Sequence, residues 1–296
     1  MFKLDMKMLL RPIVLALGLS LPAVSSVAEQ MPAPLLVQAT AVDPAVTALS
    51  DVMQMDDIIA VMRDEGLKYG ATLEDEMFPG RGGDRWDATI ASIYDGAAMR
   101  RGFDTGMSRE LAGDASTIEQ ISTFFGSDQG QNALQLEIAA RRALLDPSAE
   151  DAAKVAWEDM LAEDHPRVAM LRRFAEANDL IESNVMGALN ANLAFYKGMA
   201  STGAFPDEMT EEQMLSDVWS QEPEVRAETE DWLFPFLALA YQPMSDADLE
   251  AYIAFSETEP GQKINAALFS AFDDVFTGIS YALGQAAARQ MQGEDI

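Results

Sequence analysis

A single histidine and the absence of cysteine limit the chemistry that this chain can perform. His165 lies between Asp164 and Pro166, at a predicted link between helices. A histidine-based zinc site or a catalytic triad needs partners, and the sequence contains no second histidine and no cysteine. We therefore interpret His165 as a surface residue, because acid–base catalysis requires a positioned partner.

Carboxylates are the most abundant candidates for catalysis, with 49 aspartates and glutamates in 296 residues. Glu182-Ser183 resembles the Glu-Ser pair of periplasmic lytic transglycosylases, but the Gly-Leu-Met-Gln segment that flanks the pair in those enzymes is absent. A two-residue match among so many acids carries little information. Glycosidases with two carboxylates depend on a separation in space that a sequence does not provide. A carboxylate-dependent hydrolase acting on cell-wall glycan or peptide stays an alternative function.

Two further patterns suggest ligand binding but lack the complete motif. Asp246 with Asp248 and Asp273 with Asp274 are acid pairs, yet the calcium loop D-x-[DN]-x-[DN]-G does not occur. The segment from Phe78 to Arg85 (FPGRGGDR) lacks the Gly-Lys-Ser/Thr end of a phosphate-binding loop and predicts a plain loop. We identify no catalytic, cofactor-binding or metal-binding residue.

Aromatic residues form two stripes at helical spacing. The stripes consist of Trp232, Phe234, Phe236 and Tyr241, and of Phe269, Phe272, Phe276 and Tyr281. Such stripes usually pack in a core. The alternative is an apolar groove that accepts a peptide or a lipid tail.

The first residues predict export through a cleavable signal peptide. Residues 1–28 combine basic residues, a short apolar run from Pro12 to Leu21, and small residues before a predicted cleavage site after Ala28. The apolar run is shorter than the roughly 20 residues of a membrane-spanning helix. We expect a periplasmic mature chain without a stable membrane anchor. Without cysteine, its stability must come from a packed core.

The charge of the chain excludes a common class of partner. The net charge is −29, and removal of residues 1–28, which carry +2, leaves −31. An acidic protein of this kind repels nucleic acid and anionic lipid. The acids are scattered through the chain, so solubility is the simplest role of the charge.

Helical patterns follow a lead-in over residues 29–42 that we expect to be flexible. Apolar residues recur at steps of three and four, for example from Met55 to Met77. Asp43-Pro44 and Asp146-Pro147 are typical helix starts. Capping boxes are predicted at Ser116 to Glu119 and Thr210 to Gln213. Alternating runs of β-branched residues are absent, so the predicted fold class is all-α.

An internal repeat divides the chain. Glu119 to Gln131 (EQISTFFGSDQGQ) and Glu250 to Gln262 (EAYIAFSETEPGQ) match at a constant offset of 131 residues. Each copy predicts a helical hairpin in which Phe124 or Phe255 anchors the corner. Gly130 and Gly261 follow at equivalent positions and would allow the two helices to pack closely. The repeat predicts two halves related by a pseudo-two-fold axis, residues 43–163 with the weaker copy and residues 164–296 with the stronger copy.

A looser match precedes each copy. Met55 to Ile59 (MDDII) resembles Ala177 to Ile181 (ANDLI), at an offset of 122 residues. The difference from 131 requires an insertion between the looser match and the hairpin.

At the hairpin motif the chain resembles the domain-of-unknown-function 2059 family of bacterial exported proteins. Members carry a phenylalanine or tyrosine, a short Ser/Thr-Pro-type link and then Gly-Gln or Gly-Lys. The segment Phe255 to Gln262 matches this pattern, whereas in Phe124 to Gln131 the proline is replaced by Gln129. The resemblance covers residues 230–290, with a weaker echo over 95–145. It implies a helical periplasmic protein and supplies no catalytic residue.

These observations favour a non-enzymatic module that binds another envelope protein or peptide, or assists its assembly. No cofactor and no nucleic acid are expected. A homotypic structural protein is a further alternative, and the oligomeric state stays open. The binding hypothesis predicts a continuous apolar groove between the two hairpins.

Overall fold

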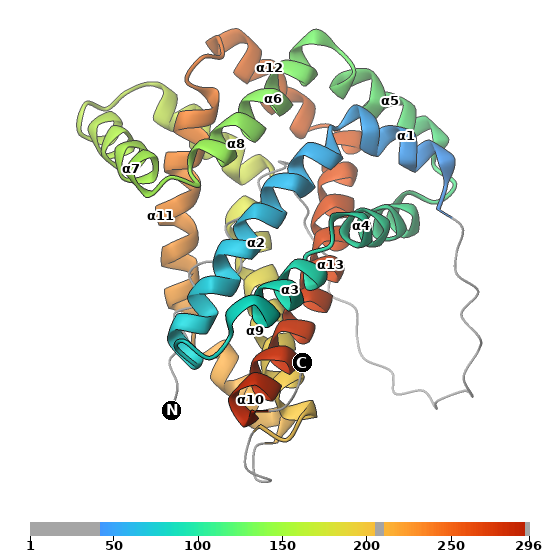
Figure 1. Cartoon of the computed structure of the whole chain (residues 1–296). Helices are drawn as coiled ribbons and strands as arrows, with labels where there is room; N and C mark the ends of the chain where they lie inside the picture. The colour runs from blue at the N-terminus through green and yellow to red at the C-terminus, as the bar shows by residue number, and fades with distance from the viewer. Residues whose placement is uncertain (1–41, 205–209, 294–296) are drawn as a thin grey trace.

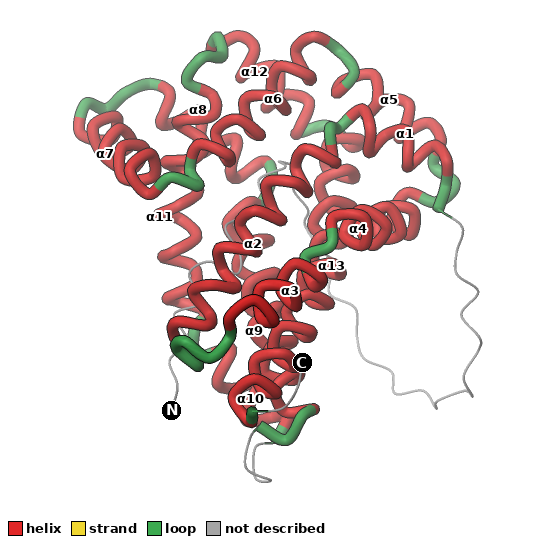
Figure 2. Tube along the Cα trace, viewed as in Figure 1, coloured by secondary structure: helices red, strands yellow, loops and turns green. Residues whose placement is uncertain are grey.

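The structure is a computed structural model that describes residues 42–204 and 210–293. Its described residues form helices, turns and loops without a strand, which confirms the all-α prediction (Figure 2). The predicted signal peptide and residues 29–41 of the lead-in lie outside the described residues. None of the described helices is long and apolar enough to span a membrane.

Helices follow one another with short connections (Figure 1). The first seven are α1 (Pro44–Val52), α2 (Met55–Met77), α3 (Gly83–Ile93), α4 (Gly96–Leu111), α5 (Ala115–Phe125), α6 (Asp128–Ala143) and α7 (Pro147–Ala162). The remaining ones are α8 (Arg167–Ala177), α9 (Leu180–Ser201), α10 (Glu211–Trp219), α11 (Glu222–Tyr241), α12 (Asp246–Ser256) and α13 (Glu259–Gln292).

Helix starts depend on the capping residues that the sequence contains. Asp43 and Asp146 accept hydrogen bonds from backbone amides at the starts of α1 and α7, as predicted. The capping box of Thr210 and Gln213 at α10 is also confirmed. The predicted box at Ser116 to Glu119 is wrong, because Asp114 caps α5 instead and accepts from the amide of Thr117 at 3.1 Å.

Helix α13 is the longest helix and runs through the centre of the protein beside α9 (Figure 1). Two glycines permit this approach. A β-carbon on Gly198 would lie 2.1 Å from the carbonyl oxygen of Tyr281, and one on Gly284 would lie 2.1 Å from that of Phe195. Distances this short are possible only where no side chain is present. The backbones of α9 and α13 therefore touch at their crossing.

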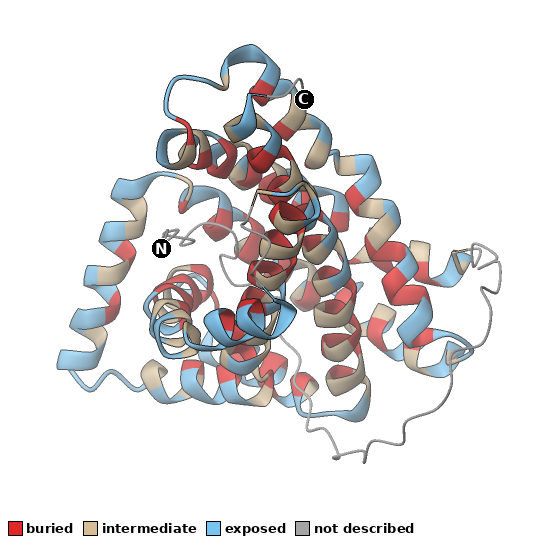
Figure 3. Ribbon diagram, turned by 90° about the horizontal axis from the view of Figure 1, so that it is seen from below, coloured by how far each residue is buried: buried red, intermediate tan, exposed pale blue. Residues whose placement is uncertain are grey.

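One hydrophobic core contains residues from both predicted halves, including Phe103 of α4 and Phe272 of α13, whose ring centroids lie 4.7 Å apart. Buried residues concentrate on the inner helices, while outer helices expose their polar faces (Figure 3). Five residues of the aromatic stripes are buried, as expected for core: Trp232, Phe236, Tyr241, Phe272 and Phe276.

Candidate functional site

The two predicted hairpin corners have the same local structure. Helices α5 and α6 meet at Ser127, and α12 and α13 meet at Thr258. Each hydroxyl donates a hydrogen bond at 2.6 Å to the carbonyl oxygen of the corner phenylalanine, Phe124 or Phe255. Each hydroxyl also accepts from the amide of the following glycine at 3.1 Å. The serine and threonine thus fix the angle between the two helices.

The glycines at these corners are required by close backbone approach. A β-carbon on Gly130 would lie 2.3 Å from the carbonyl oxygen of Phe124, and one on Gly261 would lie 2.1 Å from that of Phe255. The prediction that both glycines allow close packing is confirmed.

The glutamine that follows each glycine joins the hairpin to an earlier helix. The side-chain amide of Gln131 donates to the carbonyl oxygens of Phe125 and Val52. The amide of Gln262 donates to those of Ser256 and Ala177. Gln131 and Gln262 are therefore structural links rather than ligand-binding residues.

The helices reached by these glutamines also correspond. Val52 and Ala177 are the last residues of α1 and α8, and each is followed two positions later by a residue in the left-handed conformation, Gln54 or Asp179. Both pairs differ by 125 residues. The predicted offset of 122 for the looser match is therefore wrong by three residues, because the sequence MDDII has been aligned with the end of α8 rather than the start of α9.

The two corners pack against each other. The rings of Phe124 and Phe255 are stacked, with centroids 3.8 Å apart and planes 1° apart. Nearby, the amide of Gln129 donates to the carbonyl oxygen of Asp248, and Lys263 pairs with Asp114 at 2.5 Å. The space where the groove between the hairpins was predicted is filled at this point by the two rings.

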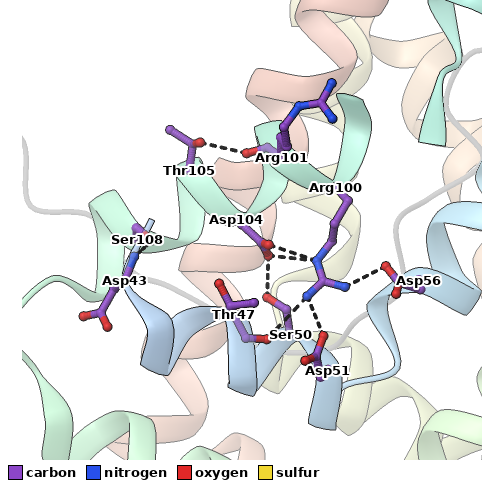
Figure 4. Close-up of polar contacts among 10 residues, drawn as sticks. All are labelled: Asp43, Thr47, Ser50, Asp51, Asp56, Arg100, Arg101, Asp104, Thr105 and Ser108. Carbon is purple, nitrogen blue, oxygen red and sulfur yellow. Dashed lines mark hydrogen bonds and ion pairs between the residues drawn. The ribbon is translucent and has the colours of Figure 1, made fainter. Parts of the chain in front are cut away.

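A cluster around Arg100 ties α4 to α1 and α2 (Figure 4). Its guanidinium group contacts carboxylates of Asp51, Asp56 and Asp104 at 2.7, 2.6 and 3.0 Å. Asp104 also accepts from the hydroxyl of Ser50 at 2.7 Å. Burial lowers the pKa of Arg100, but the hydrogen bonds to the three carboxylates outweigh it and raise that pKa. All these contacts are internal, so the cluster positions α1 rather than presenting a free charge.

The most unusual titratable group is Glu137 on α6, whose residue is 4% exposed. Its Oε1 accepts a hydrogen bond of 2.7 Å from the hydroxyl of Tyr241 at the end of α11. The hydroxyl of Tyr252 on α12 is buried beside the same carboxyl group, without a partner that satisfies hydrogen-bond geometry. Burial raises the pKa of Glu137 to about 7, and the two tyrosine hydroxyls oppose this effect. A proton on Glu137 is thus exchangeable near neutral pH, but the group lies in the core and away from any substrate in solvent.

The acids considered as catalytic or calcium-binding residues serve other contacts. Glu182 pairs with Arg226 at 2.6 Å, and Asp246 pairs with Arg167 at 2.7 Å. The carboxylate of Asp248 accepts a hydrogen bond of 2.6 Å from the hydroxyl of Ser245, which caps α12. No group of three or more histidine, aspartate or glutamate side chains in the described residues could hold a metal ion.

Asp273 and Asp274, the other acid pair, contact different partners. Asp273 accepts from the amide of Asn190 at 3.0 Å, whereas Asp274 pairs with Arg109 at 2.7 Å. His165 is exposed, and its Nδ1 accepts from the amide of Arg167 at 3.2 Å. The structure therefore gives each of these candidates its own partner and does not bring them together in one site.

An exposed apolar pair lies on α10. Leu215 is 42% exposed and Trp219 is 49% exposed, one helical turn apart on the same face. Met214 and Val218, each one residue earlier and so about 100° around the helix, are buried. Val218 packs with α9 in a small hydrophobic cluster that is separate from the main core. Helix α10 is thus attached by one face and leaves the other open.

Comparisons with models of known protein families, with curated proteins and with solved structures found no match. The resemblance to the domain-of-unknown-function 2059 family stays a prediction.

Sequence reasoning missed both Glu137 and the α10 pair. Glu137 lies on a helix with one other acid, Asp128, and its burial depends on contacts with α11 and α12 that are distant in sequence. The pair of Leu215 and Trp219 has a local signal, because this apolar pair at a spacing of four lies beside a second one, Met214 and Val218. The apolar stripe of α10 is therefore wider than its buried side, which suggests an additional contact surface.

Proposed function

We propose that this chain is a non-enzymatic periplasmic module that binds another envelope protein or peptide through the outer face of α10. The observation that carries the proposal is the exposure of Trp219 beside Leu215. Tryptophan is among the residues that most often dominate the energy of a protein interface. The other three tryptophans, Trp86, Trp157 and Trp232, are buried.

Charge around this pair supports a cationic partner. Glu211, Glu212 and Asp217 are exposed on α10, and the nearest cation from α9, Lys197, is paired with Glu211 at 2.5 Å. At the start of α11, Arg226 is neutralised by Glu222 and by Glu182. A basic amphipathic segment would bury its apolar side on the pair and place lysine or arginine against the acids.

The periplasmic location in this proposal rests on the predicted signal peptide. The internal use of the candidate acids, with Glu182 paired to Arg226 and Asp246 to Arg167, favours binding over hydrolysis of cell-wall material. The shared corner contacts also support an origin of the halves 43–163 and 164–296 by internal duplication, with the boundary near His165 in the link between α7 and α8.

Tryptophan fluorescence provides the direct test. The probe is a short helical peptide of leucine and lysine, with a glutamate-for-lysine version as the charge control. We expect the basic peptide to shift the emission of Trp219 to shorter wavelength and to shield it from acrylamide, and we expect the acidic peptide to have no effect. Because electrostatic attraction is screened, binding should weaken as salt increases.

Variants distinguish specific binding at this surface of α10 from non-specific adsorption of the peptide. Trp219→Ala and Asp217→Lys should each weaken binding about tenfold or more, as loss of an interface anchor or of charge complementarity does. Leu161→Ser on α7 removes another exposed apolar side chain and should bind as the wild type does. If isothermal titration calorimetry showed that Trp219→Ala binds the basic peptide as tightly as the wild type, α10 would not be the binding surface.

Two other outcomes would favour the alternative functions. Release of fragments from purified cell wall, abolished by substitution of an acid, would favour a hydrolase. Concentration-dependent self-association that Trp219→Ala abolishes would favour the homotypic protein, in which a second copy covers α10.

A further inference from the structure

Three helices from different parts of the chain meet at Glu137. The carboxyl group comes from α6 in the first half, while Tyr241 ends α11 and Tyr252 lies in the middle of α12 in the second half. Tyr241 and Tyr252 are also buried, and their ring centroids lie 6.2 Å apart. Phe174 of α8 closes the cluster, with its ring 5.1 Å from each tyrosine ring. The carboxyl group is thus enclosed by aromatic side chains.

The groups that act on the charge of Glu137 are hydroxyls rather than cations. Burial, the hydroxyl of Tyr241 and the hydroxyl of Tyr252 account for its shifted pKa. One turn further along α6, Arg141 forms an ion pair with Glu65 of α2, with a nitrogen–oxygen distance of 2.8 Å. Arg141, the cation nearest to Glu137 along α6, is thus paired with the carboxylate of Glu65.

Two cations of α8, which packs on α11 and α12, are engaged elsewhere as well, and the third, Arg172, is exposed. Arg167 donates to the carbonyl oxygens of Tyr241 and Met244 and pairs with Asp246. Arg173 pairs with Glu250 and Glu257 at the surface. Ionised Glu137 would therefore be a charge inside an aromatic cluster whose neighbouring cations already have partners.

We propose that Glu137 is a proton-sensitive latch that holds α6 against α11 and α12 when protonated and loosens this junction when ionised. The proposal goes beyond the binding function of α10 and does not depend on it.

The protonation states differ in what they need from their surroundings. A protonated carboxyl group has one O–H donor and keeps an acceptor for Tyr241, and the unpartnered hydroxyl of Tyr252 is the adjacent acceptor. When the proton leaves to solvent, a full negative charge stays in a low-dielectric site, where two tyrosine hydroxyls and no cation offset only part of the cost of burial. Entry of water between the helices relieves that penalty, so the junction opens locally.

Two measurements on the full mature chain test the latch. Carbon-13 NMR of side-chain carboxyl groups, assigned with Glu137→Gln, should reveal one glutamate that titrates far above the others. Hydrogen exchange followed by mass spectrometry, corrected for the intrinsic effect of pH, should show peptides from the end of α11 and from α12 opening about tenfold more readily at about pH 8 than at about pH 5. In Glu137→Gln the same peptides should stay protected at both pH values.

The result that overturns the proposal is an unchanged pH dependence of exchange in Glu137→Gln. A carboxyl resonance of Glu137 that titrates with the exposed glutamates would overturn it too, and this reading uses the wild-type protein even if the variant folds poorly. Glu119→Gln on α5, an exposed acid close in sequence, is the matched control and should leave the exchange profile unchanged.

Discussion

Phe124 and Phe255 stack face to face, with ring centroids 3.8 Å apart, although they are separated by 131 residues in the sequence. Each ring belongs to the corner of one hairpin, and the stack joins α5 to α12. Both rings also contact Phe125, which is fully buried. The corners are therefore a contact between the two halves as well as turns within each half.

The stack predicts a measurable coupling between the two phenylalanines. Phe124→Leu and Phe255→Leu should each destabilise the protein, and the double variant should lose less than the sum by about 0.5 to 1.5 kcal/mol, the value of an aromatic pair. Urea unfolding measures the three free energies. Phe124→Leu combined with Phe234→Leu is the control, because Phe234 stacks on Trp157 elsewhere and should add independently. Additive losses for Phe124 and Phe255 would contradict the coupling.

Substitution of glycine by alanine should have opposite effects on stability at two positions of α13, the corner glycine Gly261 and the mid-helix glycine Gly278. Gly261→Ala places a β-carbon 2.1 Å from a backbone oxygen and should destabilise by about 1 to 3 kcal/mol, the range for overpacking. Gly278→Ala on the same helix meets nothing within 4 Å and should stabilise by up to about 1 kcal/mol through helix propensity.

Thermal and urea unfolding of both glycine variants checks this difference. A neutral Gly261→Ala would mean that α12 and α13 can separate at the corner without loss. A destabilised Gly278→Ala would point to a contact that the structure lacks.

The local parts of this fold are readable from the sequence, and its long-range contacts are not. Helix starts are capped by Asp43, Asp146 and Thr210 through hydrogen bonds that span two or three residues. The roles of these residues can therefore be predicted from spacing alone. The hairpin corners are predictable for the same reason, since Ser127 and Thr258 act within their own turns.

Contacts between helices depend on geometry that no spacing encodes. Gln131 has two backbone acceptors, one six residues away and one 79 residues away, and only the first could be anticipated. Glu137 has the sequence context of an exposed helical acid, yet Tyr241 reaches it from 104 residues away. The predicted capping box at Ser116 is wrong for a local reason, because Asp114, two positions earlier, is the residue that caps this helix start.

The Arg100 cluster predicts that loss of Arg100 destabilises the protein far more than loss of Arg173, which also pairs with carboxylates. Arg100→Met leaves the carboxylate of Asp104, whose side chain is 10% exposed, without its cation. Loss of a partner from a largely buried pair costs about 3 kcal/mol or more. Arg173→Met also removes two ion pairs, with Glu250 and Glu257, but those side chains are well exposed, so we expect a much smaller loss than for Arg100→Met.

Urea unfolding of the two arginine variants at equal salt measures the contrast. The double variant Arg100→Met/Asp104→Asn should recover part of the loss, since the buried charge is then removed as well. Equal destabilisation by Arg100→Met and Arg173→Met would mean that burial of Asp104 contributes little.

Glu137 predicts a stability that falls as pH rises, opposite to the behaviour of an ion-paired acid. In the unfolded chain the glutamate ionises near its ordinary pKa of 4.5, whereas in the folded protein burial raises its pKa to about 7. Between these values the folded state retains a proton that the unfolded state has lost. The contribution of Glu137 to the free energy of unfolding therefore falls from about pH 4.5 to about pH 7 and is constant outside this window, with a total on the order of 3 kcal/mol.

Glu137→Gln removes this proton linkage while keeping an acceptor for Tyr241. The variant should match the wild type near pH 4.5 and exceed its free energy of unfolding at pH 7 and above, because an amide carries no charge to bury. Urea unfolding at closely spaced pH values gives both curves, and their difference isolates Glu137 from the other 48 acids, which titrate in both proteins. A constant difference across the whole range would show that the substitution alters packing only. A difference that grows as pH falls would mean that folded Glu137 is ionised at neutral pH and stabilised by its two tyrosine hydroxyls.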